Sequence, residues 1–235
     1  RRGKPVIGYL GEYDALPGLS QKVSPQREEL VKGGAGHGCG HNLLGVGSLA
    51  AAAALKREIE AGRLAGTVRY FGCPAEETLI GKVFMAKHGL YDDLDAAITW
   101  HPMWMNTAWG GTSLAMNSVR FAFYGRTAHA AAAPHMGVSA LDAVELMNTG
   151  VNFLREHVVQ EARIHYVITK GGGEPNVVPA AAEVWYYIRA PKRQDVEEIY
   201  QRILKIAEGA CLMTGATMET RFQTGVYEYL PNAVL

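Results

Sequence analysis

Hydrophobic residues in the first half of the chain fall into short apolar runs and longer Ala- and Leu-rich stretches. The short runs predict buried strands and the longer stretches predict helices. We expect strands at residues 5–10, 67–73 and 96–100, and helices at residues 44–61 and 81–88. Residues 18–40 are rich in Gly, Pro, Ser and charge, which predicts a long loop. Strands that alternate with helices indicate a mainly parallel sheet with helices on both faces.

The second half follows a different pattern, in which apolar residues alternate with polar ones in several segments. Strands are expected at residues 118–124, 163–169, 182–188 and 216–222, and helices at residues 139–156 and 195–211. This order, strand–helix–strand–strand–helix–strand, is that of a ferredoxin-like domain. We therefore predict an α/β protein of two domains, residues 1–116 and residues 117–227, with the boundary near Asn117.

Composition and charge exclude several classes of protein. The chain has 235 residues, of which 48% are hydrophobic, and its 23 basic residues balance 23 acidic ones. That balance argues against a disordered chain, a nucleic-acid-binding domain and a polybasic membrane-surface protein. The longest apolar stretch, residues 43–55, is shorter than the roughly 20 residues that a membrane span needs.

Cysteine content and the start of the chain give two further expectations. Three cysteines are too few and too scattered for a disulfide framework, which favours a reducing, cytoplasmic setting. No signal peptide opens the chain. The chain also starts without Met, so we expect a piece of a longer protein.

Candidate chemistry gathers where the predicted strands of the first half end. In an open α/β sheet, ligands bind beyond the carboxyl ends of the strands. The residues found there, or just before the first long helix, are Glu12, Asp14, Cys39, His41, Glu76, Glu77 and His101. Their joint placement predicts a site that binds metals or moves protons.

Cys39 and His41 lie in a glycine-rich segment before the first long helix. A helix N-terminus favours a thiolate, which is the form of cysteine that binds metals. Two alternatives remain open. One is a glycine-rich turn with incidental polar side chains, and the other is a cysteine nucleophile.

Glu76 and Glu77 follow a buried strand, and His101 follows another. One glutamate can bind a cation while its neighbour acts as a base on water. Two solvated carboxylates and a structural histidine are the alternatives. Cysteine, histidine and carboxylate together suit zinc, with manganese favoured if carboxylates dominate.

The second half offers His129, Asn176 and Arg189. Arg189 lies at a strand end, where its guanidinium could hold a substrate carboxylate through a bidentate pair. A surface salt bridge is the alternative.

Eight short motifs along nearly the whole chain carry a family resemblance. They are residues 11–18 (GEYDALPG), 36–42 (GHGCGHN), 74–77 (PAEE), 100–102 (WHP), 127–131 (TAHAA), 139–143 (SALDA), 175–179 (PNVVP) and 188–191 (IRAP). In this order they resemble the amidohydrolase branch of the aminoacylase/carboxypeptidase family of dinuclear metallopeptidases.

The resemblance implies a role for each candidate residue. Four resemble metal ligands: Cys39, which bridges two ions, and His41, Glu77 and His101. Glu76 resembles the general base, and Asp14 resembles a carboxylate that orients the site. His129 resembles a lid histidine that reaches into the partner subunit's site. Asn176 and Arg189 resemble residues that hold the substrate carboxylate.

The same resemblance implies an activity and an assembly. The activity is hydrolysis of N-acyl amino acids with two divalent ions, zinc or manganese. The folate breakdown product p-aminobenzoyl-glutamate is the favoured substrate, with dipeptides and other N-acyl amino acids as alternatives. Residues 1–116 would form part of the catalytic domain and residues 117–227 a lid that dimerises, as a homodimer or with a paralogous subunit. Residues 228–235 would begin the return to the catalytic domain.

Two departures from the family pattern weigh against full activity of this chain. No residue here matches the family's last metal-binding histidine, which follows the lid. The bulky residues 78–80 replace a small, glycine-rich run after the two glutamates. An impaired hydrolase is therefore one expectation, and a non-catalytic dimerisation or ligand-binding fragment is the other.

Overall fold

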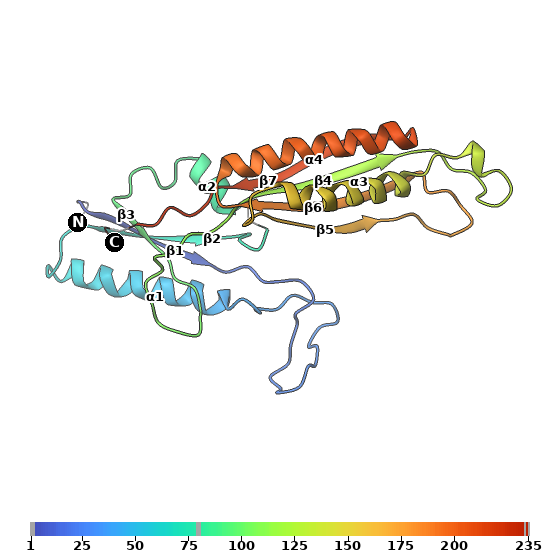
Figure 1. Ribbon diagram of the computed structural model, residues 1–235. Coiled ribbons are helices and arrows are strands. Elements are labelled where there is room, and N and C mark those ends of the chain that lie inside the picture. The colour runs from blue at the N-terminus through green and yellow to red at the C-terminus, as the bar shows by residue number, and fades with distance from the viewer. Residues whose placement is uncertain (1–2, 79–80, 233, 235) are drawn as a thin grey trace. The chain divides into compact units, whose positions relative to one another are not determined.

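The computed structural model describes residues 3–78, 81–232 and 234 (Figure 1). Leu79 and Ile80, two of the three bulky residues that depart from the family pattern, lie outside the described residues. The chain divides into two compact units, residues 1–107 and residues 108–235. Within the described residues, none of the helices is long and apolar enough to cross a membrane.

The first unit contains a three-stranded parallel sheet, which confirms the sheet type predicted for this half. Its elements are β1 (Val6–Glu12), α1 (His41–Glu60), β2 (Thr67–Cys73), α2 (Gly81–Lys87) and β3 (Ala96–Ile98). The strand order is β2-β1-β3, so β1 is central. The carboxyl end of β1 therefore lies between the carboxyl ends of β2 and β3, as a site at this edge requires.

Close packing of α1 on β1 fixes where the helix begins relative to the sheet. The Ser48 hydroxyl donates a hydrogen bond to the Leu10 carbonyl oxygen at 3.2 Å. A Cβ at Gly45 would lie 2.9 Å from the carbonyl oxygen of Glu12, too close for any side chain. Glycine at this position lets the first turns of α1 approach the carboxyl end of β1, which brings His41 to Glu12.

The second unit is a four-stranded antiparallel sheet with the predicted ferredoxin-like element order. Its elements are β4 (Ala115–Tyr124), α3 (Ala140–Leu154), β5 (Arg163–Lys170), β6 (Ala181–Ala190), α4 (Arg193–Thr214) and β7 (Thr217–Val226), with short 3-10 turns at Pro134–Met136 and Arg155–His157. The strand order is β5-β6-β4-β7. Every neighbouring pair is antiparallel, which confirms the ferredoxin-like fold class.

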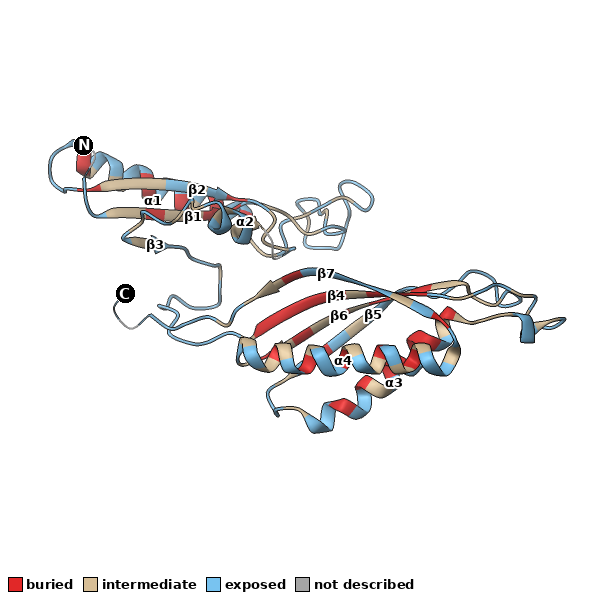
Figure 2. Cartoon of the chain, turned by 90° about the horizontal axis from the view of Figure 1, so that it is seen from above, coloured by how far each residue is buried: buried red, intermediate tan, exposed pale blue. Residues whose placement is uncertain are grey.

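The core of the second unit lies between one face of its sheet and the helices α3 and α4 (Figure 2). Side chains alternate across β6, so Val184, Tyr186 and Ile188 are buried in this core. The Tyr186 hydroxyl donates a 2.5 Å hydrogen bond to Asn148 Oδ1, which satisfies a buried polar group. The opposite face of the sheet carries the intervening residues of β6, from Glu183 to Arg189.

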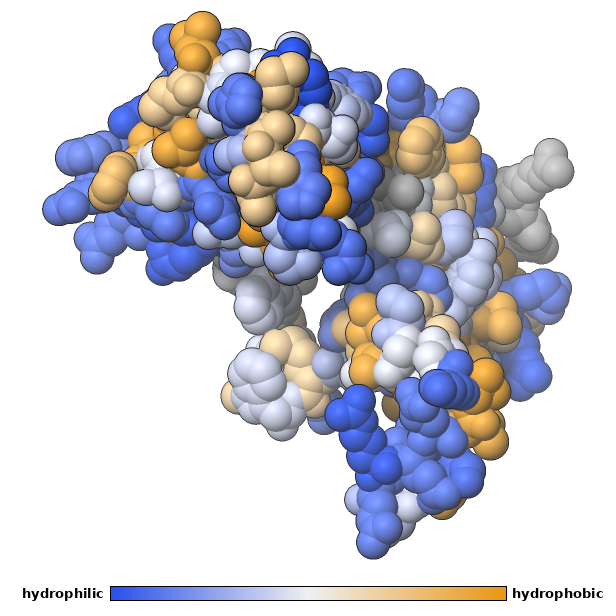
Figure 3. All heavy atoms as spheres, turned by 90° about the vertical axis from the view of Figure 1, so that its right-hand side faces the viewer, coloured by the Kyte–Doolittle hydropathy of each residue, from blue (hydrophilic) through white to orange (hydrophobic). Residues whose placement is uncertain are grey.

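Hydrophilic side chains cover much of the surface that Figure 3 presents, with hydrophobic side chains scattered among them. Exposed hydrophobic residues are common on soluble folds and need no separate explanation when they occur singly.

Candidate metal centre

Polar side chains from four segments of the first unit meet at the carboxyl edge of its sheet. Glu12 ends β1, Glu76 follows β2, His101 follows β3, and His41 is the first residue of α1. Gly40 precedes His41 with a φ of +80°, a left-handed conformation that glycine adopts without strain. This turn ends the long loop and places the first residue of α1 next to the carboxyl ends of the strands.

His41 lies at the centre of the cluster and is fully buried. Its Nδ1 is 3.2 Å from Asp14 Oδ1 and 3.8 Å from Glu77 Oε1. Its Nε2 is 3.2 Å from Glu12 Oε2 and 3.8 Å from Glu76 Oε2. Of these contacts only the one with Asp14 is a hydrogen bond, and Nε2 has no hydrogen-bond partner among the described residues. A carboxylate can only accept, so Nδ1 donates to Asp14, and in the neutral ring Nε2 keeps a lone pair.

Cys39 and His101 form the other half of the cluster. The Sγ atom of Cys39 lies 3.2 Å from Nε2 of His101. The other ring nitrogen of His101, Nδ1, donates to the Pro102 carbonyl oxygen at 2.9 Å, so Nε2 keeps its lone pair. One ligand atom each from Cys39, His41 and His101 lie within 4.8 Å of one another, and Glu12, His41 and Glu76 form a second such group.

Asp14 connects two of the predicted ligands. Its Oδ2 accepts the backbone N–H of Glu77 at 3.0 Å, while its Oδ1 faces His41. Burial by itself would raise the pKa of Asp14. Hydrogen bonds from the backbone of Glu77, of Asp14 itself and of Glu76, and from His41, outweigh burial and lower that pKa. Asp14 therefore stays a carboxylate that orients its neighbours.

The carboxylates of the cluster raise the pKa of two nearby groups. Burial, followed by repulsion from Glu12 and Glu77, raises the pKa of Glu76 despite the attraction of Lys82 and His41. Burial and the charges of Glu77, Glu76 and Glu12 raise the pKa of the Cys39 thiol. This direction is opposite to the thiolate preference expected at the helix N-terminus, because burial and the nearby carboxylates outweigh that preference in the metal-free chain.

The donor set fits a divalent cation. Nε2 of His41 and Oε1 of Glu77 are buried and lack a hydrogen-bond partner among the described residues. Buried polar atoms are rarely left unpaired, and here both belong to predicted ligands. Thiol, imidazole and carboxylate donors at one point are the ligands of zinc, and a carboxylate-rich set also admits manganese.

Sequence reasoning placed Glu12 among the polar residues at the strand ends without a role of its own, and it missed Lys82. The Lys82 ammonium donates to Glu12 Oε1 at 2.5 Å, and the other oxygen of Glu12 faces His41. Glu12 was visible as a polar residue at a strand end. No sequence signal singles out Lys82, because only the fold brings its ammonium group to the Glu12 carboxylate.

In the second unit, His129 and Asn176 lie next to each other. A bridge pairs His129 with Val177, and the backbone N–H of Ala130 donates to the Asn176 carbonyl oxygen at 2.9 Å. Nδ1 of His129 accepts the backbone N–H groups of Ala131 and Ala132, at 3.2 and 3.1 Å. The ring proton therefore lies on Nε2, which is left as a donor.

Within one chain, Arg189 lies far from His129 and Asn176. It pairs with Met116 and Arg163 near the far end of β6, whereas the loop that contains Asn176 leads into Ala181, at the start of β6. At about 3.3 Å per residue, Ala181 and Arg189 are roughly 25 Å apart. Asn176 and Arg189 of a single chain therefore cannot hold one carboxylate together.

Comparisons with known proteins find similar chains. Residues 113–212 match the family model of the M20 peptidase dimerisation domain. The chain is 54% identical, over 100% of its own length and 49% of the relative, to a subunit of the p-aminobenzoyl-glutamate hydrolase of Escherichia coli. It is 33% identical, over 97% of its length and 50% of the relative, to the Xaa-Arg dipeptidase of Mus musculus.

Solved structures share the fold. One of them is a Bacillus subtilis protein described as a dinuclear metal binding peptidase from the M20 family. It matches with a TM-score of 0.61 and 22% identity, over 98% of this chain and 59% of that chain. The chain spans about half the length of the curated relatives that it matches.

Proposed function

Because the chain carries an M20 peptidase dimerisation domain and is similar over its whole length to a subunit of p-aminobenzoyl-glutamate hydrolase, we propose that it is part of a metal-dependent amide hydrolase. The proposed substrates are N-acyl amino acids, with p-aminobenzoyl-glutamate first among them. The observation that carries this proposal is the cluster around His41, where lone pairs of histidine, cysteine and carboxylate converge.

The residues proposed to hold two divalent ions, zinc or manganese, are Cys39, His41, Glu77 and His101. Cys39 would bind through its sulfur in the thiolate form. When bound, such ions polarise the scissile carbonyl and make water more acidic. The paired contacts of Asp14 with His41 and Glu77 would keep two of these ligands in position.

Glu76 is the proposed general base. Its carboxylate lies beside the ligand cluster, 3.8 Å from His41. The raised pKa makes it a stronger base than a solvated glutamate. Glu76 takes a proton from the attacking water and passes it to the nitrogen of the leaving amine.

Residues of the second unit are proposed to bind substrate and its developing charge. Nε2–H of His129, held outward by the contacts at Nδ1, would donate to the oxyanion in the partner subunit's site. Asn176 lies beside His129 and would act on the same partner site, while Arg189 would pair with the substrate carboxylate. The separation of Asn176 from Arg189 supports this division between subunits. The partner is a second copy of this chain or a paralogous subunit.

A dipeptidase of the same family is the second candidate. The observation that favours it is the 33% identity to the Xaa-Arg dipeptidase. A non-catalytic dimerisation or ligand-binding role is the remaining alternative. The three cysteines of the chain are free, and we propose a reducing, cytoplasmic location on that ground.

The proposal is tested by hydrolysis of p-aminobenzoyl-glutamate after the chain is reloaded with zinc or manganese. We expect turnover by the wild-type chain and a loss of about 100-fold or more in Glu76→Ala, with unchanged metal content. Glu60→Ala, which removes an exposed carboxylate of α1, is the matched control and should keep full turnover. Ordinary turnover by Glu76→Ala would show that another group is the base. Absence of turnover in the wild type would favour the non-catalytic alternative.

A further inference from the structure

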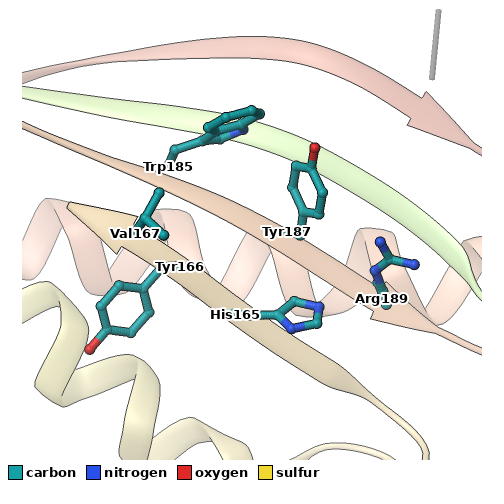
Figure 4. Close-up of a pocket in the computed structure, with 6 residues that line it drawn as sticks. All are labelled: His165, Tyr166, Val167, Trp185, Tyr187 and Arg189. Carbon is teal, nitrogen blue, oxygen red and sulfur yellow. The ribbon is translucent and has the colours of Figure 1, made fainter. Parts of the chain in front are cut away.

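A hollow of about 300 Å³ lies between β5 and β6 of the second unit (Figure 4). Its lining residues are His165, Tyr166, Val167, Trp185, Tyr187 and Arg189. The strand register pairs His165 with Tyr187 and Val167 with Trp185, so these four side chains share one face of the sheet. That face is opposite the one that packs on the helices.

The rings in the hollow form a fixed aromatic surface. Tyr187 meets Trp185 edge to face, at 5.4 Å between ring centroids, and meets His165 in the same manner at 6.5 Å. The indole N–H of Trp185 donates to the Ser118 hydroxyl at 2.8 Å. The guanidinium of Arg120 lies 4.2 Å over the indole ring. These contacts hold Trp185 in place, so the surface is organised before any ligand arrives.

The hollow lacks negative charge. None of its six lining residues is acidic, and the guanidinium of Arg189 lies 5.6 Å from the ring centroid of Tyr187. Nε of Arg189 is buried and has no hydrogen-bond partner in the part of the chain that the structure describes. Burial, together with the charges of Arg189 and Arg155, lowers the pKa of His165. The surroundings of Arg189 thus favour an anion.

We propose that this hollow binds the aryl group of an N-aroyl amino acid while Arg189 pairs with the carboxylate of the same molecule. The proposal rests on the proposed function, from which it takes the role of Arg189, and it adds the part of the chain that recognises the acyl group. Tyr187 is the specificity-determining residue, because its ring contacts the rings of Trp185 and His165 and lies next to the guanidinium of Arg189.

An aromatic acyl group uses features of the hollow that an aliphatic one does not. A planar ring can pack edge to face or offset against Tyr187 and Trp185, which adds to the effect of simple burial. An acetyl group buries less apolar area and makes no ring contact. Both kinds of ligand use Arg189 equally, so the ring contacts alone distinguish them.

Binding of two ligands to the metal-depleted chain, measured by isothermal titration calorimetry, tests the proposal. The ligands are p-aminobenzoyl-glutamate and N-acetyl-glutamate, which carry the same two carboxylates and differ in the acyl group. The wild type should bind the aroyl ligand about threefold to tenfold more tightly. Tyr187→Leu should remove this preference, and Tyr187→Phe, which keeps the ring, should retain it. Arg189→Gln should weaken both ligands by about tenfold or more.

Three results would overturn the proposal. They are equal affinity of the wild type for the two ligands, no binding of either at millimolar concentration, and equal weakening of both by Tyr187→Leu. Phe153→Leu, which removes an exposed ring from α3, is the control for loss of an aromatic residue and should change neither affinity. Hydrolysis is measured separately. Selective binding without hydrolysis would contradict the proposed function and leave this inference standing.

Discussion

His41 is the residue around which the polar side chains of the first unit are arranged. It is fully buried, yet carboxylate oxygens of four residues lie within 3.8 Å of its ring nitrogens. Burying so many acidic groups together is unfavourable unless positive charge balances them. Lys82 supplies one such charge through Glu12. The remaining excess of carboxylates is what a divalent cation would neutralise.

Asp14 should control how well the cluster binds metal. It fixes the proton on Nδ1 of His41 and holds the backbone of Glu77. We expect Asp14→Asn to weaken zinc affinity by about 10-fold to 100-fold, as measured by competition with a chelator, because the carboxamide holds the ring less firmly. Asp93→Asn, which breaks an exposed pair with Arg69, should leave the affinity unchanged. Equal affinities in wild type and Asp14→Asn would exclude this orienting role.

At the residue scale, the sequence indicated which side chains meet but not their charge states. Motif spacing and strand ends pointed to Cys39, His41 and the two glutamates, which the fold brings together. The raised pKa of the Cys39 thiol could not be predicted, because it depends on burial and on carboxylates from two other segments of the chain. The pairing of Lys82 with Glu12 joins residues 70 positions apart and has no local signal.

At the scale of elements, the hydrophobic pattern predicted the order of the α-helices and strands in the described chain but neither of the 3-10 helices. The ends of the predicted elements differ from the observed ones by a few residues. The predicted helix at residues 44–61 begins at His41 instead, because Leu43 and Leu44 already donate to the carbonyl oxygen of Gly40. Strand β4 begins at Ala115, three residues before its predicted start, because it pairs there with Ala190. Hydrogen bonding to a neighbouring strand can make a strand longer than the segment in which apolar and polar residues alternate.

Glu183 joins all four strands of the second sheet. From β6 it accepts hydrogen bonds from Thr169 of β5 at 2.6 Å and Arg120 of β4 at 2.7 Å, and it faces Arg221 of β7 at 3.7 Å. The Thr169 hydrogen bond, followed by the Arg120 and Arg221 contacts, lowers the pKa of Glu183 against the effect of burial. A carboxylate whose pKa is lowered by folding stabilises the fold at any pH above its unfolded-state pKa. This stabilisation is lost as the pH falls through the lowered pKa of the folded state.

We therefore expect Glu183→Gln to lower the free energy of unfolding by about 1–2 kcal/mol at pH 7. The difference from wild type should begin to shrink as the pH falls below about 4.5, the ordinary pKa of a glutamate, because the unfolded state is protonated first. It should be lost once the pH lies below the lowered pKa of the folded state, where Glu183 is protonated in both states. Thermal unfolding followed by circular dichroism across this pH range measures it. Glu145→Gln, at an exposed position of α3, should show no difference at any pH. A pH-independent deficit in Glu183→Gln would contradict the ionic explanation.

At the scale of the whole molecule, the candidate residues fall into two groups, one in each unit. The first holds the metal-binding candidates, and the second is the dimerisation domain with His129, Asn176 and Arg189. The division into a parallel and an antiparallel unit was predictable from the change in periodicity near residue 117. The separation of Asn176 from Arg189 was not, because it follows from which end of β6 each residue occupies.

If His129 acts on the partner subunit's site, two inactive variants should complement each other. Glu76→Ala and His129→Ala are each expected to lose turnover. In a mixed dimer, one site combines the altered Glu76 position of one subunit with the altered His129 position of the other. The second site keeps both Glu76 and His129. After subunit exchange in an equal mixture, turnover should recover to about a quarter of the wild-type value by random pairing. No recovery, with mixed dimers shown to form, would contradict action across the dimer.

The central claim is that the cluster around His41 binds divalent metal. Its most direct test is the metal content of the purified chain, measured by elemental mass spectrometry after dialysis against metal-free buffer. We expect at least one zinc or manganese ion per wild-type chain and a large loss in Cys39→Ala and in His101→Ala, both with wild-type circular dichroism. A wild-type chain without metal, or variants that keep the wild-type content, would contradict the account.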